Sequence, residues 1–148
     1  MQKGMKEKTI TGVLCLYIIA FGVPPSLNSE RTDKLIYKKI GEYIAQIEGN
    51  QKVTVIAPDN RIMFYANLLA PTTEFAIQIG NYEQLQKLQY QDFIVFLKEN
   101  RVKYFVYNDK SWMTDYDFFA TAKPEHFKEI RRWEDAHRGK SVLLEVLL

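Results

Sequence analysis

The feature of this chain that most constrains its fold is an alternation of helical and strand patterns, which runs from residue 31 to residue 148. Apolar residues recur at helical spacing over about Arg31–Glu48, and the short β-branched run Val53–Ala57 follows between turn residues. A second helix is expected over about Arg61–Leu69, ended by Pro71. Glu74–Ile79 alternates apolar and polar residues, which predicts a second strand.

The second half of the chain continues this alternation. Asn81–Leu97 predicts a helical region that breaks near Gln89–Gln91, and Val102–Tyr107 predicts a third buried strand. We expect the remaining elements in this order: helical turns at Trp112–Thr121 and Glu125–Ala136, and a last strand at Ser141–Leu147. Alternation of this kind predicts an α/β fold with crossover connections. We expect a small, mostly parallel sheet of about four strands with helices on both faces, a Rossmann-like three-layer arrangement. The last strand would pair at an edge, with antiparallel pairing as one option.

The N-terminal segment is apolar behind a basic head. Three lysines within the first eight residues precede the strongly apolar run Ile10–Val23. That run is shorter than the ~20 residues of a spanning helix and fits the ~7–15 of a signal-peptide core. We therefore expect a signal-like or transmembrane segment at residues 1–28 and a soluble α/β domain at residues 29–148. A cleaved signal peptide, the tail of a last membrane helix and a buried first element of the fold all remain open. In the membrane readings, the lysines favour a cytoplasmic N-terminus and an extracytoplasmic domain.

Composition excludes several classes of function. The net charge of +2 comes from interspersed acids and bases, which predicts no nucleic-acid partner. The chain contains no glycine-rich phosphate loop, so a nucleotide cofactor is not expected. Its single cysteine, Cys15, lies in the apolar run, and His126 and His137 have no partners at metal-ligand spacing. We expect no metal, no cofactor and no catalytic residue in this chain.

Polar residues follow two of the predicted strands and form the candidate ligand site. They are Asp59, Asn60 and Arg61 after the first strand, and Asn108, Asp109, Lys110 and Ser111 after the third. In open α/β sheets, ligands bind outside the carboxyl ends of the strands. If these two strands are neighbours, the two loops converge on one crevice that would suit an anionic or sugar ligand. Backbone amides at the start of the Arg61 helix would add donors. The same residue types also cap helices and form turns in any fold of this class.

Three segments carry a family resemblance. They are KIGEYIAQIEGNQKVTVIAPDNRIMFYAN, RVKYFVYND and PEHFKEIRRWEDAHRGKSVLLEVLL, and the first contains Asp59, Arg61, Tyr65 and Ala66. Over about Arg31–Leu148 the chain resembles the C-terminal soluble domain of integral-membrane glycosyltransferases. The family is the dolichyl-phosphate-mannose-protein mannosyltransferase type, which uses polyprenyl-phosphate sugars. In that family the domain follows the last membrane helix, which favours this identity for Ile10–Val23 over a cleaved leader.

The resemblance implies an accessory role. Enzymes of that family keep their catalytic carboxylates in an extracytoplasmic loop near the start of a many-helix membrane domain, and residues 1–148 hold no counterpart. The implied partners are the membrane, an upstream transmembrane glycosyltransferase domain, and a polyprenyl-phosphate sugar or a protein or glycan acceptor. The domain would contact the acceptor or cap the membrane active site. An exported or membrane-anchored α/β binding module without transferase activity is the alternative. A free-standing enzyme has the least support, because no nucleophile–base pair is visible.

Overall fold

The structure is a computed structural model that describes residues 26–49, 51–69 and 75–148, with side chains from Leu35 onward. The predicted apolar run Ile10–Val23 therefore lies outside the described residues, as does Pro71. Within the described ranges, no helix has both the length and the apolar composition needed to cross a membrane. The compact unit Asp33–Leu148 holds every strand that the structure describes.

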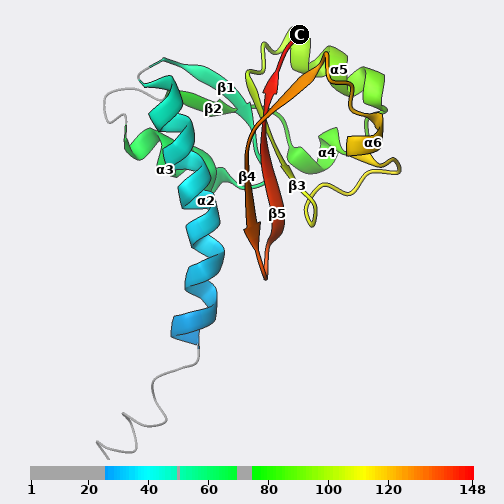
Figure 1. The fold of residues 1–148 in the computed structure, drawn as a ribbon. Helices are drawn as coiled ribbons and strands as arrows, with labels where there is room; N and C mark the ends of the chain where they lie inside the picture. Colours follow the sequence, from blue (N-terminus) through cyan, green and yellow to red (C-terminus); the bar gives the residue numbers. More distant parts are fainter. Residues whose placement is uncertain (1–25, 50, 70–74) are drawn as a thin grey trace, which may run out of the picture. The chain divides into compact units, whose positions relative to one another are not determined.

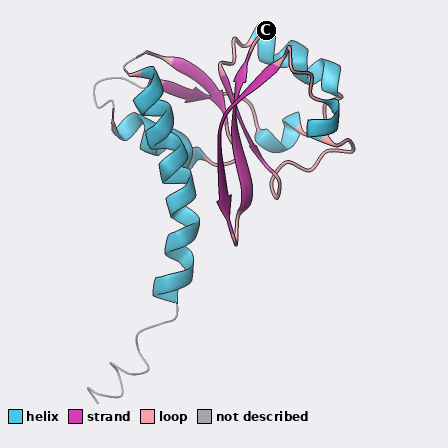
Figure 2. Cartoon of the chain, viewed as in Figure 1, coloured by secondary structure: helices cyan, strands magenta, loops and turns pink. Residues whose placement is uncertain are grey.

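Helices and strands follow one another through most of this unit (Figure 1; Figure 2). The helices are α2 (Ser26–Glu48), α3 (Asn60–Leu68), α4 (Tyr82–Leu85), α5 (Tyr90–Glu99) and α6 (Phe118–Thr121). The strands are β1 (Val53–Ile56), β2 (Ala76–Gln78), β3 (Tyr104–Asn108), β4 (Phe127–Asp135) and β5 (Gly139–Val146). The first three predicted strands are thus confirmed, as is the break in the helical region of residues 81–97.

The five strands form one sheet in the order β2-β1-β3-β5-β4. Strands β2, β1 and β3 are parallel neighbours, whereas β3 pairs with β5, and β5 with β4, in the antiparallel direction. The fold is therefore a mixed α/β fold with a parallel half and an antiparallel half. The last strand does pair antiparallel, but the prediction that it lies at an edge is wrong, because β5 sits between β3 and β4.

Alternate residues of the central strands belong to two separate hydrophobic clusters. Val55 and Val106 pack with apolar residues of α2 and α3. Ile56 and Phe105 pack with residues of α4, α5 and α6 instead. Because successive side chains of a strand point to opposite faces, α2 and α3 cover one face of the sheet and α4, α5 and α6 cover the other (Figure 1).

A glycine allows α2 and α3 to approach each other closely. A Cβ atom added at Gly41 would lie 2.3 Å from the carbonyl oxygen of Ile62 and 2.9 Å from the amide nitrogen of Ala66. No side chain fits between the two helices at this position. The lack of a side chain at Gly41 therefore allows α3 to pack this closely against α2. This contact fixes the start of α3, and with it one wall of the site described below.

The segment after α6 differs from its prediction. We expected a helix at Glu125–Ala136, but Phe127–Asp135 is the edge strand β4. The helical turns expected at Trp112–Thr121 are reduced to the four residues of α6. Strand β4 contains a β-bulge between Glu129 and Arg131, where the register with β5 shifts by one residue. The bulge breaks the two-residue alternation that identifies a strand in a sequence.

Candidate ligand-binding cleft

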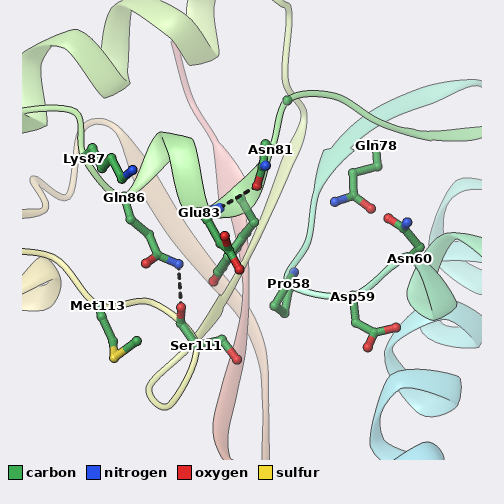
Figure 3. A pocket seen from close by; sticks show the side chains of 12 residues that line it. Pro58, Asp59, Asn60, Gln78, Asn81, Glu83, Gln86, Lys87, Ser111 and Met113 are labelled. Atoms are coloured by element: carbon green, nitrogen blue, oxygen red, sulfur yellow. Dashed lines mark hydrogen bonds between the residues drawn. The ribbon is translucent and has the colours of Figure 1, made fainter.

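A cleft of about 920 Å³ opens at the carboxyl ends of the three parallel strands. Its lining comes from the segments that follow β1, β2 and β3 (Figure 3). The lining residues are Pro58, Asp59, Asn60, Gln78, Gly80, Asn81, Tyr82, Glu83, Gln86, Lys87, Ser111 and Met113. In the order β2-β1-β3, the chain places β2 on one side of β1 and then β3 on the other side. The cleft therefore lies at a topological switch point, where the direction of strand addition reverses. Open α/β sheets bind their ligands at that position.

Two walls of this cleft face each other across Pro58. Figure 3 shows the side-chain amides of Asn60 and Gln78 on one side, and the side chains of Gln86, Lys87 and Ser111 on the other. The Glu83 carboxylate lies between the two walls, and the Asp59 carboxylate points away from the Gln78 amide. The Gln86 Nε2 donates to the Ser111 carbonyl oxygen, which ties the segment after β2 to the segment after β3.

The loop after β1 is organised by Asp59, which caps α3. Its Oδ1 accepts hydrogen bonds from the Arg61 amide and from Arg61 Nε, both at 2.8 Å, and its Oδ2 accepts from Arg61 Nη2 at 2.7 Å. Burial alone would raise the pKa of Asp59, but these hydrogen bonds outweigh it and hold that pKa below its usual value of 3.8. The Arg61 guanidinium also lies 5.0 Å from the ring centroid of Tyr37 on α2. Arg61 is therefore held by Asp59 and Tyr37, and it is not among the residues that line the cleft.

The loop after β3 is held by Asn108, which is 1% exposed. Its Nδ2 donates to the Arg138 carbonyl oxygen and to Ser141 Oγ, and its Oδ1 accepts from the amides of Lys110 and Ser111. Every hydrogen-bonding position of the Asn108 amide group is thus engaged within the protein. Asn108 therefore stabilises the fold by joining its own loop to residues 138 and 141, and it does not line the cleft.

The two residues that follow Asn108 turn toward the β4–β5 hairpin. Asp109 Oδ1 accepts from the Lys140 amide at 2.9 Å, and Lys110 Nζ donates to the His137 carbonyl oxygen at 2.8 Å. Of the loop expected after the third strand, only Ser111 lines the cleft. The expected convergence of two acids and two bases is therefore not present there, because Arg61, Asp109 and Lys110 are engaged elsewhere.

The segment after β2 supplies half of the residues that line the cleft, and sequence reasoning missed it. Gln78 Nε2 donates to the Ala57 carbonyl oxygen at 2.9 Å, and Asn81 caps α4 by accepting from the Glu83 amide at 3.0 Å. Gly80, which has a φ of +76°, makes the turn between them. The pair Gly80–Asn81 was the available signal, since a glycine and a capping asparagine mark the carboxyl end of a strand that precedes a helix.

Acid–base and metal chemistry find little support among the described residues. No group of three or more His, Cys, Asp or Glu side chains in the described ranges could hold a metal ion. His126 Nδ1 lies 2.9 Å from Tyr90 Oη and stacks on that ring, and neither residue lines the cleft. Neither His126 nor His137 is among the residues that line the cleft with Ser111. The amides, hydroxyl, carboxylates and ammonium that line the cleft can form hydrogen bonds and ion pairs.

A second, smaller hollow of about 350 Å³ lies between α2 and β4. The rings of Tyr43 and Trp133 meet edge to face there, with centroids 5.7 Å apart. The Arg131 guanidinium lies 4.7 Å from the Tyr43 centroid and 5.5 Å from the Trp133 centroid. Because Arg131 already covers both aromatic rings, the carboxyl-edge cleft is the stronger candidate site.

Comparison with known proteins adds no relative. No family model matches this chain, and neither a curated protein nor a solved structure matches it.

Proposed function

We propose that this chain is the extracytoplasmic accessory domain of a membrane glycosyltransferase that uses a polyprenyl-phosphate-linked sugar. The parallel half of its sheet is the core of a Rossmann-like three-layer fold, and the carboxyl-edge cleft is its working surface. The observation that carries this proposal is the cleft itself, which gathers polar side chains after three neighbouring parallel strands. The resemblance of residues 31–148 supplies the class of enzyme.

The cleft supports binding more than catalysis. Its described side chains include no nucleophile–base pair and no metal-binding group. The transfer reaction therefore belongs to a membrane domain, and this domain contacts the acceptor or caps the active site. In this proposal the partners are the membrane domain, the polyprenyl-phosphate sugar and the acceptor. The N-terminal segment attaches the α/β domain to the membrane.

The alternative is an exported or membrane-anchored binding module that has no transferase partner. The same cleft would serve such a module, so the decision must come from a transferase assay. Membranes from source cells lacking this chain are expected to lose sugar transfer from labelled polyprenyl-phosphate mannose or glucose to endogenous acceptors. Re-expression of the full chain should restore transfer. Intact transfer in its absence would support the binding module and contradict the accessory role.

A second assay separates an accessory domain from an enzyme. The purified full chain, incubated alone with the same lipid-linked sugars and acceptors, is expected to release no product. Turnover by the purified chain would contradict the accessory assignment, because it would locate the chemistry in these 148 residues.

A further inference from the structure

The carboxyl-edge cleft contains a mixed set of hydrogen-bonding groups that the protein itself does not use. Among the described residues, no hydrogen bond or ion pair engages the side chains of Asn60, Glu83, Lys87 or Ser111. The Gln78 Oε1 is buried and has no partner in the described structure, although Gln78 Nε2 is fixed on Ala57. These groups offer an amide, a carbonyl, a carboxylate, an ammonium and a hydroxyl, and so include both donors and acceptors.

The charges of the cleft do not favour an anion. Lys87 is the one cation among the described lining residues, and it stands with two carboxylates, those of Asp59 and Glu83. The Arg61 guanidinium, in the loop that follows β1, is already paired with Asp59 at 2.7 Å. Because Asp59 and Arg61 neutralise each other, Glu83 and Lys87 leave the cleft with no net positive charge to offset the charge of about −1.5 to −2 that a phosphate monoester carries at neutral pH.

Side chains of the protein already cap one amide at each helix start beside the cleft. The Arg61 amide at the start of α3 donates to Asp59 Oδ1, and the Glu83 amide at the start of α4 donates to Asn81 Oδ1. Phosphates bind helix N-termini through free backbone amides of this kind. Because side chains of the protein occupy these two amides, the cleft has fewer backbone donors for a phosphate group.

Apolar surface accompanies the polar groups. Pro58, the Tyr82 ring and Met113 also line the cleft, and Met113 is 75% exposed. A sugar ring presents hydroxyl groups that both donate and accept, together with apolar C–H faces. The cleft volume of about 920 Å³ falls within the usual range for ligand pockets.

We infer that the carboxyl-edge cleft binds a neutral saccharide of the acceptor, through Asn60 and Gln78 on one wall, Ser111 on the other and Glu83 between them. The inference deepens the proposed function and rests on it. Within that function, it assigns the cleft to the acceptor sugar and leaves the phosphate-bearing donor to the membrane domain.

Nuclear magnetic resonance titration of the full, ¹⁵N-labelled chain tests this directly. The chain is kept in a detergent without a sugar headgroup, because a glycoside detergent would itself compete. The neutral probes are the methyl glycosides of mannose, glucose, galactose and N-acetylglucosamine, and the anionic probes are inorganic phosphate and mannose 1-phosphate. At least one neutral glycoside is expected to shift the amide resonances of Asn60, Gln78, Gly80 and Ser111. Its affinity should not change with salt, since no net charge is involved.

Charge variants make the test sharper. Glu83→Lys is expected to raise the affinity for mannose 1-phosphate at least ~10-fold while leaving the neutral glycoside no tighter bound. Glu99→Lys, on the exposed end of α5 and away from the cleft, is the matched control and should change neither affinity. Asn60→Ala removes one hydrogen-bonding group and should weaken the glycoside about threefold to tenfold.

The outcomes separate the inference from the proposed function. Binding of phosphate or mannose 1-phosphate in the wild-type cleft, without binding of neutral glycosides, would overturn the inference and leave the accessory role standing. Shifts that map to the Tyr43–Trp133 hollow, or no shift with any probe, would overturn the inference as well. The proposed function then depends on the membrane transfer assay alone.

Discussion

Asp59 was a candidate ligand residue, and its contacts make it the cap of α3. Asp59→Ala removes the acceptor of the Arg61 amide and the partner of its guanidinium. We expect the free energy of unfolding to fall by about 1 kcal/mol, the usual cost of losing an N-cap. Urea unfolding of the full chain, followed by tryptophan fluorescence, measures this, because both tryptophans lie in the unit Asp33–Leu148. Glycoside affinity should change less than it does in Asn60→Ala, and the opposite order would make Asp59 a ligand residue.

The same variant has a defined pH dependence. The pKa of Asp59 is lowered in the folded state, so its contribution to stability is present above the unfolded pKa of about 3.9 and is lost as the pH falls through the folded pKa. The stability difference between wild type and Asp59→Ala should therefore be constant near neutral pH and shrink below about pH 4. Asp59→Asn keeps a capping oxygen without the charge, so its loss at neutral pH should be smaller than that of Asp59→Ala. This loss should also shrink below about pH 4, because the group that titrates is the wild-type carboxylate.

Asn108 was also a candidate ligand residue, and its burial makes it a structural one. Asn108→Ala would remove the hydrogen bonds that Asn108 makes with the Arg138 carbonyl, the Ser141 hydroxyl and the Lys110 amide. Because buried polar groups without partners cost about 1–3 kcal/mol each, we expect a loss of roughly 3 kcal/mol or more. The Asn100→Ala control removes an exposed amide at the end of α5 and should cost less than about 1 kcal/mol. Equal losses of unfolding free energy in the two variants, measured by urea unfolding, would contradict the structural role of Asn108.

The candidate site illustrates what residue types can and cannot predict. The rule that ligands bind at the carboxyl ends of parallel strands correctly placed Asp59, Asn60 and Ser111 at the cleft. The rule does not say which side chains point into the cleft, and Asp109 and Lys110 instead hold the β4–β5 hairpin. Helical turns were predicted at Glu125–Ala136, where the structure has strand β4, so the sequence did not indicate the hairpin that supplies these partners.

At the scale of single elements, the packing of α2 against α3 depends on Gly41. Alanine has the higher helix propensity by about 1 kcal/mol, so propensity alone predicts that Gly41→Ala stabilises α2. The added Cβ would lie 2.3 Å from the Ile62 carbonyl oxygen, and this clash with backbone decides the sign. We expect a net loss of about 1–3 kcal/mol in the free energy of unfolding, as for other overpacked sites. Gln46→Ala, exposed on the same helix, is the control and should lie within about 0.5 kcal/mol of wild type. A more stable Gly41→Ala would mean that the two helices separate at no cost.

Strand β4 shows why one element was predicted in the wrong conformation. Phe127, Ile130 and Trp133 recur every three residues among charged side chains, which is a helical spacing. The structure puts Phe127 against the α4–α6 cluster and Ile130 and Trp133 against the α2–α3 cluster, with the bulge at Glu129/Arg131 between them. Because the bulge adds one residue to β4, the apolar residues of this strand follow a three-residue spacing in place of the two-residue alternation of a regular strand.

The turn that follows β4 contains a sequence signal for a connection between two strands, which argues against a helix there. Asp135 Oδ1 accepts from the amides of His137 and Arg138, and Gly139 has a φ of +71°. An aspartate followed by a glycine four residues later is typical of a tight connection between strands. That connection turns the end of the chain back between β3 and β4, so the sheet gains an antiparallel half that the alternation of residues 31–108 could not predict. The parallel half, by contrast, has a plain sequence signature, since its strands are short apolar runs separated by helical patterns.

For the whole molecule, the decisive prediction is its orientation. The lysines at the start of the chain favour a cytoplasmic N-terminus, so residue 148 should lie outside the cytoplasm. A reporter enzyme that is active only after forming disulfides in an oxidising compartment, fused after Leu148, should be active. A reporter that requires the cytoplasm should be inactive at the same position. Replacing Lys3, Lys6 and Lys8 by glutamate removes the charge bias and should reduce the first signal while raising the second. Activity of the cytoplasmic reporter alone in the unmodified chain would contradict the orientation, and with it the extracytoplasmic role proposed for the cleft.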